Sequence, residues 1–232
     1  MDRLPHQPHK VDVAINIDET LLLEKIWASV LGPEREKLES EWHWRYAHTF
    51  INFTLRILQH QGKISDSSLL STHKEQTLRG LSVCSIGGTE ACILAALGAQ
   101  ATCIGPELTH FPAPEKTTIV PHRLNPDIAQ QYAEAFDVTM SRRVLDFGSG
   151  LDNSSYLGHQ RHYLSFLLSA LAMTKLNGIS VHSINPIIFD GQLGRKGVRE
   201  DVEKYARILE TEKDYDVTYC FTPTQHIEAS SI

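Results

Sequence analysis

Short apolar segments alternate with helical segments over residues 81–221, and this alternation constrains the fold more than any other feature of the sequence. Each apolar run is bounded by glycine, proline or polar residues, as strands are. A strand–helix–strand unit packs its helix on the sheet, so the pattern predicts an α/β fold with a doubly wound, mostly parallel sheet covered on both faces. The predicted strands are 81–86, 99–104, 117–120, 136–140, 179–184 and 215–221, and the predicted helices are 89–97, 126–135, 156–175 and 198–212.

The chain before this region has a different character. Its first ten residues are rich in proline and histidine, which predicts a loose tail. Two helices are expected at 18–31 and 34–61, and the second carries two apolar rows, a wider apolar arc than a surface helix needs. We expect this second helix to be covered on two sides. The sequence thus divides into a tail with helices over 1–79, which could act as a lid, and a sheet domain over 80–232.

Composition and charge exclude several classes of protein. With 232 residues, 41% of them apolar, the chain can bury its own core without disulfides or metal. No run reaches the roughly 18 apolar residues of a membrane helix, and the start of the chain lacks an apolar signal segment. Its 22 basic against 28 acidic residues leave no positive excess for a phosphate backbone, so general nucleic-acid binding is not expected. These features predict a cytoplasmic protein.

The four cysteines lie in apolar stretches, and no two of them have the two-residue spacing of a zinc or redox motif. They are expected to be buried, reduced thiols of an intracellular protein. The 12 histidines are scattered along the chain, and no metal site is predicted. The four positions are Cys84, Cys92, Cys103 and Cys220.

The turn after the first predicted strand is the leading candidate for a ligand site. In a doubly wound sheet the ligand lies beyond the carboxyl ends of the strands, at the point where the strand order reverses. Gly87 and Gly88 stand at this turn, and glycine lets a backbone approach a ligand closely. Glu107 ends the second strand region, where a carboxylate can accept hydrogen bonds from both ribose hydroxyls of a nucleoside.

At these residues the sequence resembles the class I S-adenosylmethionine-dependent methyltransferases. Residues 83–107 follow the family's first motif, a strand, a glycine-rich turn, a helix and an acid, while 136–141 and 175–181 resemble its fourth strand and the turn into its fifth. The resemblance implies a Rossmann-like methyltransferase fold, S-adenosylmethionine as cofactor, S-adenosylhomocysteine as product, and a small molecule or protein as methyl acceptor. The implied cofactor-binding residues are Ser85, Ile86, Gly87, Gly88, Thr89, Pro106, Glu107, Ser141 and Arg142.

The sequence departs from the family pattern at several positions. Ser85 stands where the family usually has Asp, and the family's Gly-x-Gly is replaced by Gly87-Gly88-Thr89. One predicted strand follows the fifth, where the family has an antiparallel pair. The resemblance implies no catalytic triad, because the methyl donor carries the reactive carbon and the protein mainly positions the reactants. No general base is assigned. Arg142 and Arg143 follow the fourth predicted strand, and either of them is a candidate partner for a carboxylate of donor or acceptor.

Other interpretations stay open. Residues 144–150 also match the family's first motif, but only 82 residues follow Gly150, too few for the remaining strands in the usual order. A nucleotide-dependent oxidoreductase shares the early strand, turn and acid, yet Thr89 and Cys92 occupy two glycine positions of its fingerprint. A non-catalytic module that keeps the fold and binds a nucleoside is the third alternative.

Overall fold

The structure is a computed structural model of the 232-residue chain. It describes residues 41–64, 78–87, 90–106, 117–142, 156–192, 195–213, 217–228 and 231–232, and all structural statements below concern these residues. The predicted tail and the predicted helix at 18–31 lie outside them.

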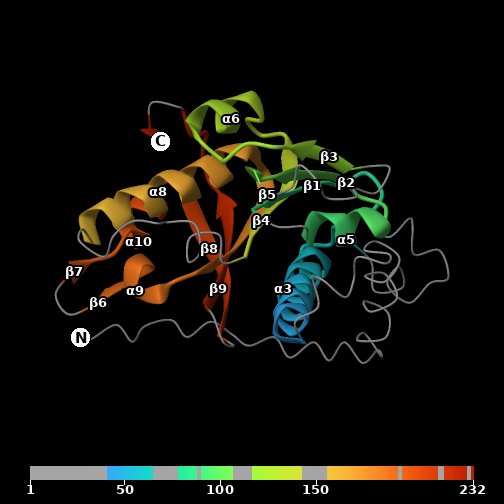
Figure 1. The fold of residues 1–232 in the computed structure, drawn as a ribbon, viewed down its shortest axis with the longest axis horizontal. Helices are drawn as coiled ribbons and strands as arrows, with labels where there is room; N and C mark the ends of the chain where they lie inside the picture. The colour runs from blue at the N-terminus through green and yellow to red at the C-terminus, as the bar shows by residue number, and fades with distance from the viewer. Residues whose placement is uncertain are drawn as a thin grey trace.

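A seven-stranded sheet forms the centre of the molecule, in the order β3-β2-β1-β4-β5-β9-β8 (Figure 1). β1 pairs in parallel with β2 on one side and with β4 on the other, which confirms that the segment 81–86 is central and 99–104 its neighbour. The five strands predicted over 81–184 are all present. The strands are β1 (Ser82–Ile86), β2 (Gln100–Ile104), β3 (Thr117–Val120), β4 (Phe136–Ser141), β5 (Thr174–Ile184), β8 (Ala206–Lys213) and β9 (Val217–Pro223).

The sheet ends in an antiparallel pair that the sequence predicted only in part. β9 runs antiparallel to both β5 and β8, so it is the one reversed strand of this sheet, and the doubly wound, mostly parallel architecture is confirmed. The helix predicted at 198–212 is wrong: only α10 (Arg199–Val202) is helical, and β8 follows it. Val202, Ala206 and Leu209 have helical spacing, but hydrogen bonds to β9 decide the conformation of this segment. A two-stranded hairpin, β6 (Gly191–Gln192) and β7 (Arg195–Lys196), was also not predicted.

Helices cover both faces of the sheet, and two apolar cores result (Figure 1). One core joins α3 and α5 to one face, and the other joins α6, α8, α9 and α10 to the opposite face, called here the α8 face. Consecutive strand residues alternate between them: Val83 belongs to the first core and Cys84 to the second. The helices not yet given are α3 (Glu41–His60), α5 (Glu90–Ala96), α6 (Pro126–Gln131), α8 (Tyr156–Met173) and α9 (Pro186–Phe189).

α3 is packed into the core by both of its apolar rows. Ile51, Leu58 and Phe53 are almost completely buried, as expected for a helix covered on two sides. Arg56 binds Glu210 and Glu212 of β8 at 2.7 and 3.0 Å, and its guanidinium lies over the ring of Phe53 at 5.3 Å. α3 therefore helps to close the first core, while the domain division at residue 80 and a lid role for 1–79 stay predictions.

The four cysteines are unpaired and buried, as predicted. Two of them are neighbours, since the sulfur of Cys92 on α5 lies 3.7 Å from that of Cys103 on β2. Within the described ranges there is no group of three metal-ligating side chains. None of the described helices combines the length and the apolar character needed to cross a membrane.

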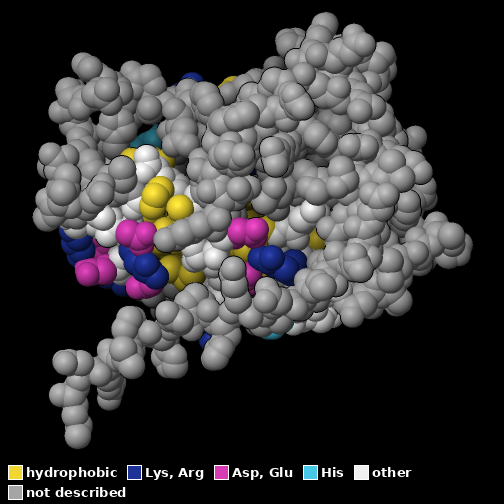
Figure 2. Space-filling view, turned by 90° about the horizontal axis from the view of Figure 1, so that it is seen from below, with side chains coloured by type: hydrophobic (Ala, Val, Ile, Leu, Met, Phe, Trp, Pro, Cys, Tyr) yellow, Lys and Arg dark blue, Asp and Glu magenta, His cyan; other side chains and the backbone are white. Residues whose placement is uncertain are grey.

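Charged side chains of both signs lie side by side on the face seen in Figure 2. Ion pairs among the described residues join positions close in sequence, such as Lys196 with Glu200 at 2.8 Å, and positions far apart, such as Arg56 with Glu210. On the described part of this face, the charges therefore mix and do not form a field of one sign.

Phe53→Ala should show that α3 belongs to the cooperative core. Removal of a ring with 2% exposure leaves a cavity between α3 and the sheet, and we expect the free energy of unfolding to fall by about 3–5 kcal/mol. His60→Ala, an exposed position on the same helix, should change it by less than about 0.5 kcal/mol. Urea denaturation followed by circular dichroism measures both. Equal, small effects would show that α3 does not contribute to global stability.

Candidate functional site

The carboxyl ends of β1 and β4 lie next to each other at the point where the strand order reverses. From β1 the chain continues to β2 and β3 on one side, and β4 then pairs on the other side. Ile86 and Ser141, the last residues of the two strands, are partners in the parallel register. Ligands of open α/β sheets bind at such a switch point, so this edge is the candidate site.

The turn after β1 has the backbone that a close approach needs. Gly87 is exposed, and its φ of 68° is a conformation that glycine adopts without steric cost. Its N–H donates to the carbonyl of Ile104 at 2.6 Å, which ties the turn to the end of β2. The turn therefore leaves the carboxyl end of β1 without a side chain at this position.

The nine predicted cofactor-binding residues divide into three groups. Ser85, Ile86 and Ser141 are buried at the ends of β1 and β4. Gly87 and Pro106 are exposed, after β1 and β2, and Arg142 follows β4 half-buried. The structure thus brings the ends of β1 and β4 together, with Ile86 and Ser141 in register. Gly88, Thr89 and Glu107 lie outside the described residues, as does the alternative motif at 144–150.

Glu90, which was not predicted from the sequence, connects the ends of β1 and β4 on the face of the sheet that α3 and α5 cover, called here the α5 face. Its carboxylate is 4% exposed and accepts a hydrogen bond from Ser85 at 3.1 Å and an ion-paired hydrogen bond from Arg142 Nε at 2.7 Å. Ser85, one of the departures from the resembled sequence pattern, thus contacts a carboxylate that stands five residues later in the sequence. That departure was the sequence signal that could have directed attention to Glu90.

Among the described residues, Arg142 makes this ion pair through Nε alone. Only its Nε is used by Glu90, and the two Nη atoms make no hydrogen bond in the described part of the chain. A guanidinium carries five N–H donors in a planar fork that fits a carboxylate. The site can therefore bind a carboxylate of a ligand while Glu90 holds the arginine in place.

A chain of buried hydrogen bonds runs from Ser141 along the opposite, α8 face of the same edge. Ser141 Oγ lies 2.7 Å from His182 Nδ1, and Ser180 Oγ lies 2.5 Å from His182 Nε2. Thr139 Oγ1 then contacts Ser180 at 2.7 Å and Thr174 at 2.6 Å. All five side chains are buried. This chain of hydrogen bonds was not predicted from the sequence. A signal for it was visible, because polar residues stand two apart in two apolar strands, at 139 and 141 and at 180 and 182.

His182 is neutral in the folded protein. Burial lowers the pKa of its imidazole to about 3, because the interior destabilises the charged form. The rings of Phe166 and Phe221 lie 6.1 and 6.2 Å from its ring centre, and both its nitrogens are hydrogen-bonded to serine hydroxyls. A neutral histidine has one nitrogen that donates and one that accepts.

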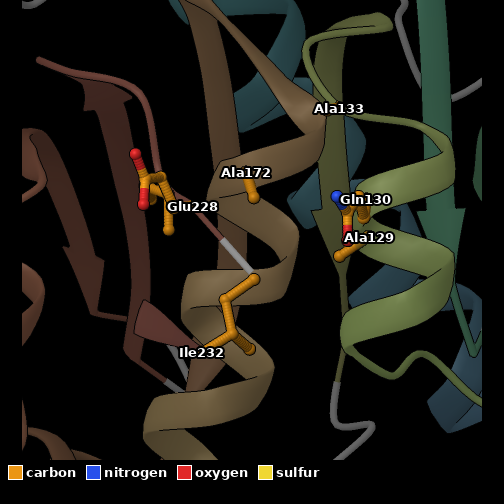
Figure 3. A pocket seen from close by; sticks show the side chains of 7 residues that line it. Ala129, Gln130, Ala133, Ala172, Glu228 and Ile232 are labelled. Atoms are coloured by element: carbon orange, nitrogen blue, oxygen red, sulfur yellow. The ribbon is translucent and has the colours of Figure 1, made fainter. Parts of the chain in front are cut away.

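A separate hollow of about 390 Å³ opens at the other end of the sheet (Figure 3). It lies between α6, the end of α8 and the C-terminal segment, with Gln130 and Glu228 on opposite sides (Figure 3). Ala172 in its wall is two residues before β5 begins, so the hollow is at the amino ends of the strands. It is not at the switch point, and we do not assign the ligand site to it.

The chain was compared with protein families, with curated proteins and with solved structures. No family model matches the chain, and no curated protein matches it. Solved structures are similar in fold to it, among them a 1,6-didemethyltoxoflavin-N1-methyltransferase of Burkholderia thailandensis, crystallised with its substrate and S-adenosylhomocysteine. That likeness has 12% identity and a TM-score of 0.46, and covers 97% of this chain and 94% of the other.

Two further structures show the same level of likeness. A 16S rRNA (adenine(1408)-N(1))-methyltransferase of Catenulisporales acidiphilia has 10% identity and a TM-score of 0.41, over 67% of this chain and 90% of the other. The methyltransferase MycE of mycinamycin biosynthesis has 12% identity and a TM-score of 0.47, over 88% and 55%. At these values of identity and TM-score, the likenesses assign neither a family nor a substrate to this chain.

Glu90→Gln should destabilise the protein, because it removes the charge that Arg142 faces in a mostly buried position. We expect a loss of about 2 kcal/mol in the free energy of unfolding, or a fall in melting temperature of roughly 4–8 °C. Glu200→Gln breaks the exposed pair with Lys196 and should cost less than about 1 kcal/mol. Thermal melts at pH 7 compare the two. Similar small losses for both variants would show that the Glu90 pair is no stronger than a surface pair.

His182→Gln should reduce the sensitivity of stability to acid. The unfolded imidazole, with a pKa of about 6.5, takes up a proton as pH falls, while the folded one stays neutral down to about 3, so stability is lost between these values. Between pH 7 and pH 5 the wild type should lose about 2 kcal/mol more than the variant. Urea denaturation at both pH values measures this difference. A variant that loses as much as the wild type would place His182 in a solvated environment.

Proposed function

We propose that this protein is an S-adenosylmethionine-dependent methyltransferase whose cofactor binds at the carboxyl ends of β1 and β4. The observation that carries the proposal is the agreement between the sequence motif and the topology. The glycine turn follows the central strand, at the switch point of a sheet that ends in the antiparallel pair implied by the resemblance.

The polar groups at this edge fit a zwitterionic nucleoside ligand. Gly87 leaves room for close backbone approach, and the Nη atoms of Arg142 can bind a carboxylate. Glu107 is proposed to accept hydrogen bonds from the ribose hydroxyls. The remaining proposed contacts come from Ser85, Ile86, Gly88, Thr89, Pro106 and Ser141.

The chain's own contribution to the reaction is positioning and desolvation. When bound, the cofactor supplies an electrophilic methyl group on a sulfonium. Arg142, held by Glu90, would fix the orientation of a carboxylate, and the end of β4 would form one wall of the site. We propose a small molecule or a protein as acceptor, since the chain has an acidic balance, and a cytoplasmic location, since its four thiols are unpaired.

Binding of S-adenosylhomocysteine provides the direct test. At about 100 times its dissociation constant a ligand stabilises the folded state by about 2.7 kcal/mol, so the melting temperature should rise by roughly 5–10 °C. NADH at the same concentration is the control for the oxidoreductase alternative and should cause no shift. A shift with NADH and none with S-adenosylhomocysteine would overturn the proposal.

Glu107→Gln should weaken S-adenosylhomocysteine about tenfold or more while the ligand-free melting temperature hardly changes. The amide keeps the shape of the side chain but loses the charge that strengthens hydrogen bonds from the ribose. Glu200→Gln, which removes an exposed carboxylate of α10, is the matched control and should bind like the wild type. Isothermal titration gives the affinities. Equal affinity of all three proteins would remove Glu107 from the site.

A further inference from the structure

Only one direction of hydrogen bonding makes all five bonds of the buried chain on the α8 face, including the bond from Thr174 to the carbonyl of Ala170. Each hydroxyl has one proton to donate. Thr174 donates to the carbonyl oxygen of Ala170 at 2.8 Å, so its oxygen accepts from Thr139 at 2.6 Å. The alternative contact from Thr139 to the same carbonyl is 3.4 Å long and does not compete. Because the proton of Thr139 is used, its oxygen accepts from Ser180 at 2.7 Å.

This direction determines which nitrogen of His182 carries the proton. The proton of Ser180 points to Thr139, so Ser180 Oγ accepts the N–H of His182 Nε2 at 2.5 Å. The imidazole is neutral, and Nδ1 therefore has a lone pair. Ser141 Oγ, 2.7 Å away, donates to that lone pair. Its only proton is thus used inside the protein.

Ser141 is left with acceptor capacity at the edge of the sheet. It is the last residue of β4, 3% exposed, and in the described part of the chain no donor contacts its oxygen. Its register partner is Ile86, and Ile86 immediately precedes the turn at Gly87. A buried oxygen with unfilled lone pairs at a ligand-binding edge favours a ligand that brings an N–H or O–H donor.

We propose that His182 is a positioning residue that directs the lone pairs of Ser141 to the bound cofactor, so that Ser141 accepts an N–H or O–H of that molecule. The identity of the ligand rests on the proposed function. The direction of the hydrogen bonds does not rest on the proposed function, because it follows from protein atoms alone. Ser141 acts as an acceptor and not as part of a proton relay, because burial lowers the pKa of His182 to about 3 and so makes the imidazole a weak base for the proton of Ser141.

The tautomer of His182 tests the direction without any ligand. In a ¹⁵N–¹H NMR spectrum of the full chain, His182 should carry its proton on Nε2, with Nδ1 unprotonated. His182→Gln identifies the signal by its loss. A proton on Nδ1 would reverse the hydrogen bond with Ser141 and overturn the proposal, whether or not the protein binds S-adenosylhomocysteine.

Two ligands separate the groups that could donate to Ser141. S-adenosylhomocysteine offers three kinds of donor: the amino-acid ammonium, the adenine amine and the ribose hydroxyls. 5′-Methylthioadenosine lacks the ammonium and keeps the adenine amine and the ribose hydroxyls. Ser141→Ala should bind S-adenosylhomocysteine about tenfold more weakly by isothermal titration. If 5′-methylthioadenosine is unaffected, the donor is the ammonium; if both weaken equally, it is the nucleoside. If the wild type binds and Ser141→Ala binds both ligands with the same affinity as the wild type, the proposal for Ser141 is overturned. If the wild type binds neither ligand, the proposed function is overturned.

A matched pair of substitutions distinguishes positioning from structural support. The amide of His182→Asn lies near the place of Nδ1 and can still accept from Ser141, whereas the longer His182→Gln reaches the place of Nε2 and leaves Ser141 without its acceptor. Both should lose similar stability. His182→Asn should keep the affinity for S-adenosylhomocysteine within about threefold, and His182→Gln should lose about fivefold to tenfold. Equal affinities of the two variants would mean that His182 has a structural role only.

Discussion

The parallel pairing of β1 with β4 is the constraint on which the rest of the site depends. It puts the ends of two strands, more than fifty residues apart in the chain, into register at Ile86 and Ser141. Side chains of neighbouring residues then point to opposite faces of the sheet. Glu90 joins the two strands on one face, and His182 stands beside Ser141 on the other. The Glu90 network depends on this pairing, and the His182 network depends on the parallel pairing of β4 with β5, which puts Ser141 in register with His182.

The two networks give the edge a defined set of donors and acceptors. Among the described residues, Glu90 uses only Nε of Arg142, and His182 is the only side chain that contacts Ser141 Oγ. In our proposal the Nη atoms bind a carboxylate and the oxygen of Ser141 accepts from a donor of the ligand. Both orienting residues are buried, so water does not compete for them. A ligand that finds oriented groups has less to order on binding, which favours affinity and correct orientation.

The central strands could be predicted because their apolar runs are buried on both faces and end at glycine, proline or polar residues. The segment 198–212 could not, because its apolar spacing fits a helix as well as a strand with a bulge between Ile208 and Glu210. Its partner β9 lies later in the chain and decides between the two. Glu90 and His182 were missed for a related reason. Each acts through a residue of another strand or helix. Spacing along the sequence marks such polar positions, but it does not show which of them meet.

The sequence by itself determined the α/β class, the central position of the segment 81–86 and the turn at Gly87, because these depend on local periodicity and on backbone conformation. Burial of the four cysteines followed from the apolar character of their surroundings. Only the tertiary structure decided the strand order beyond β5, the pairing of Arg142 with Glu90 and the direction of the chain through His182. Those features depend on distances between residues far apart in the sequence, and such distances exist only once the sheet has formed.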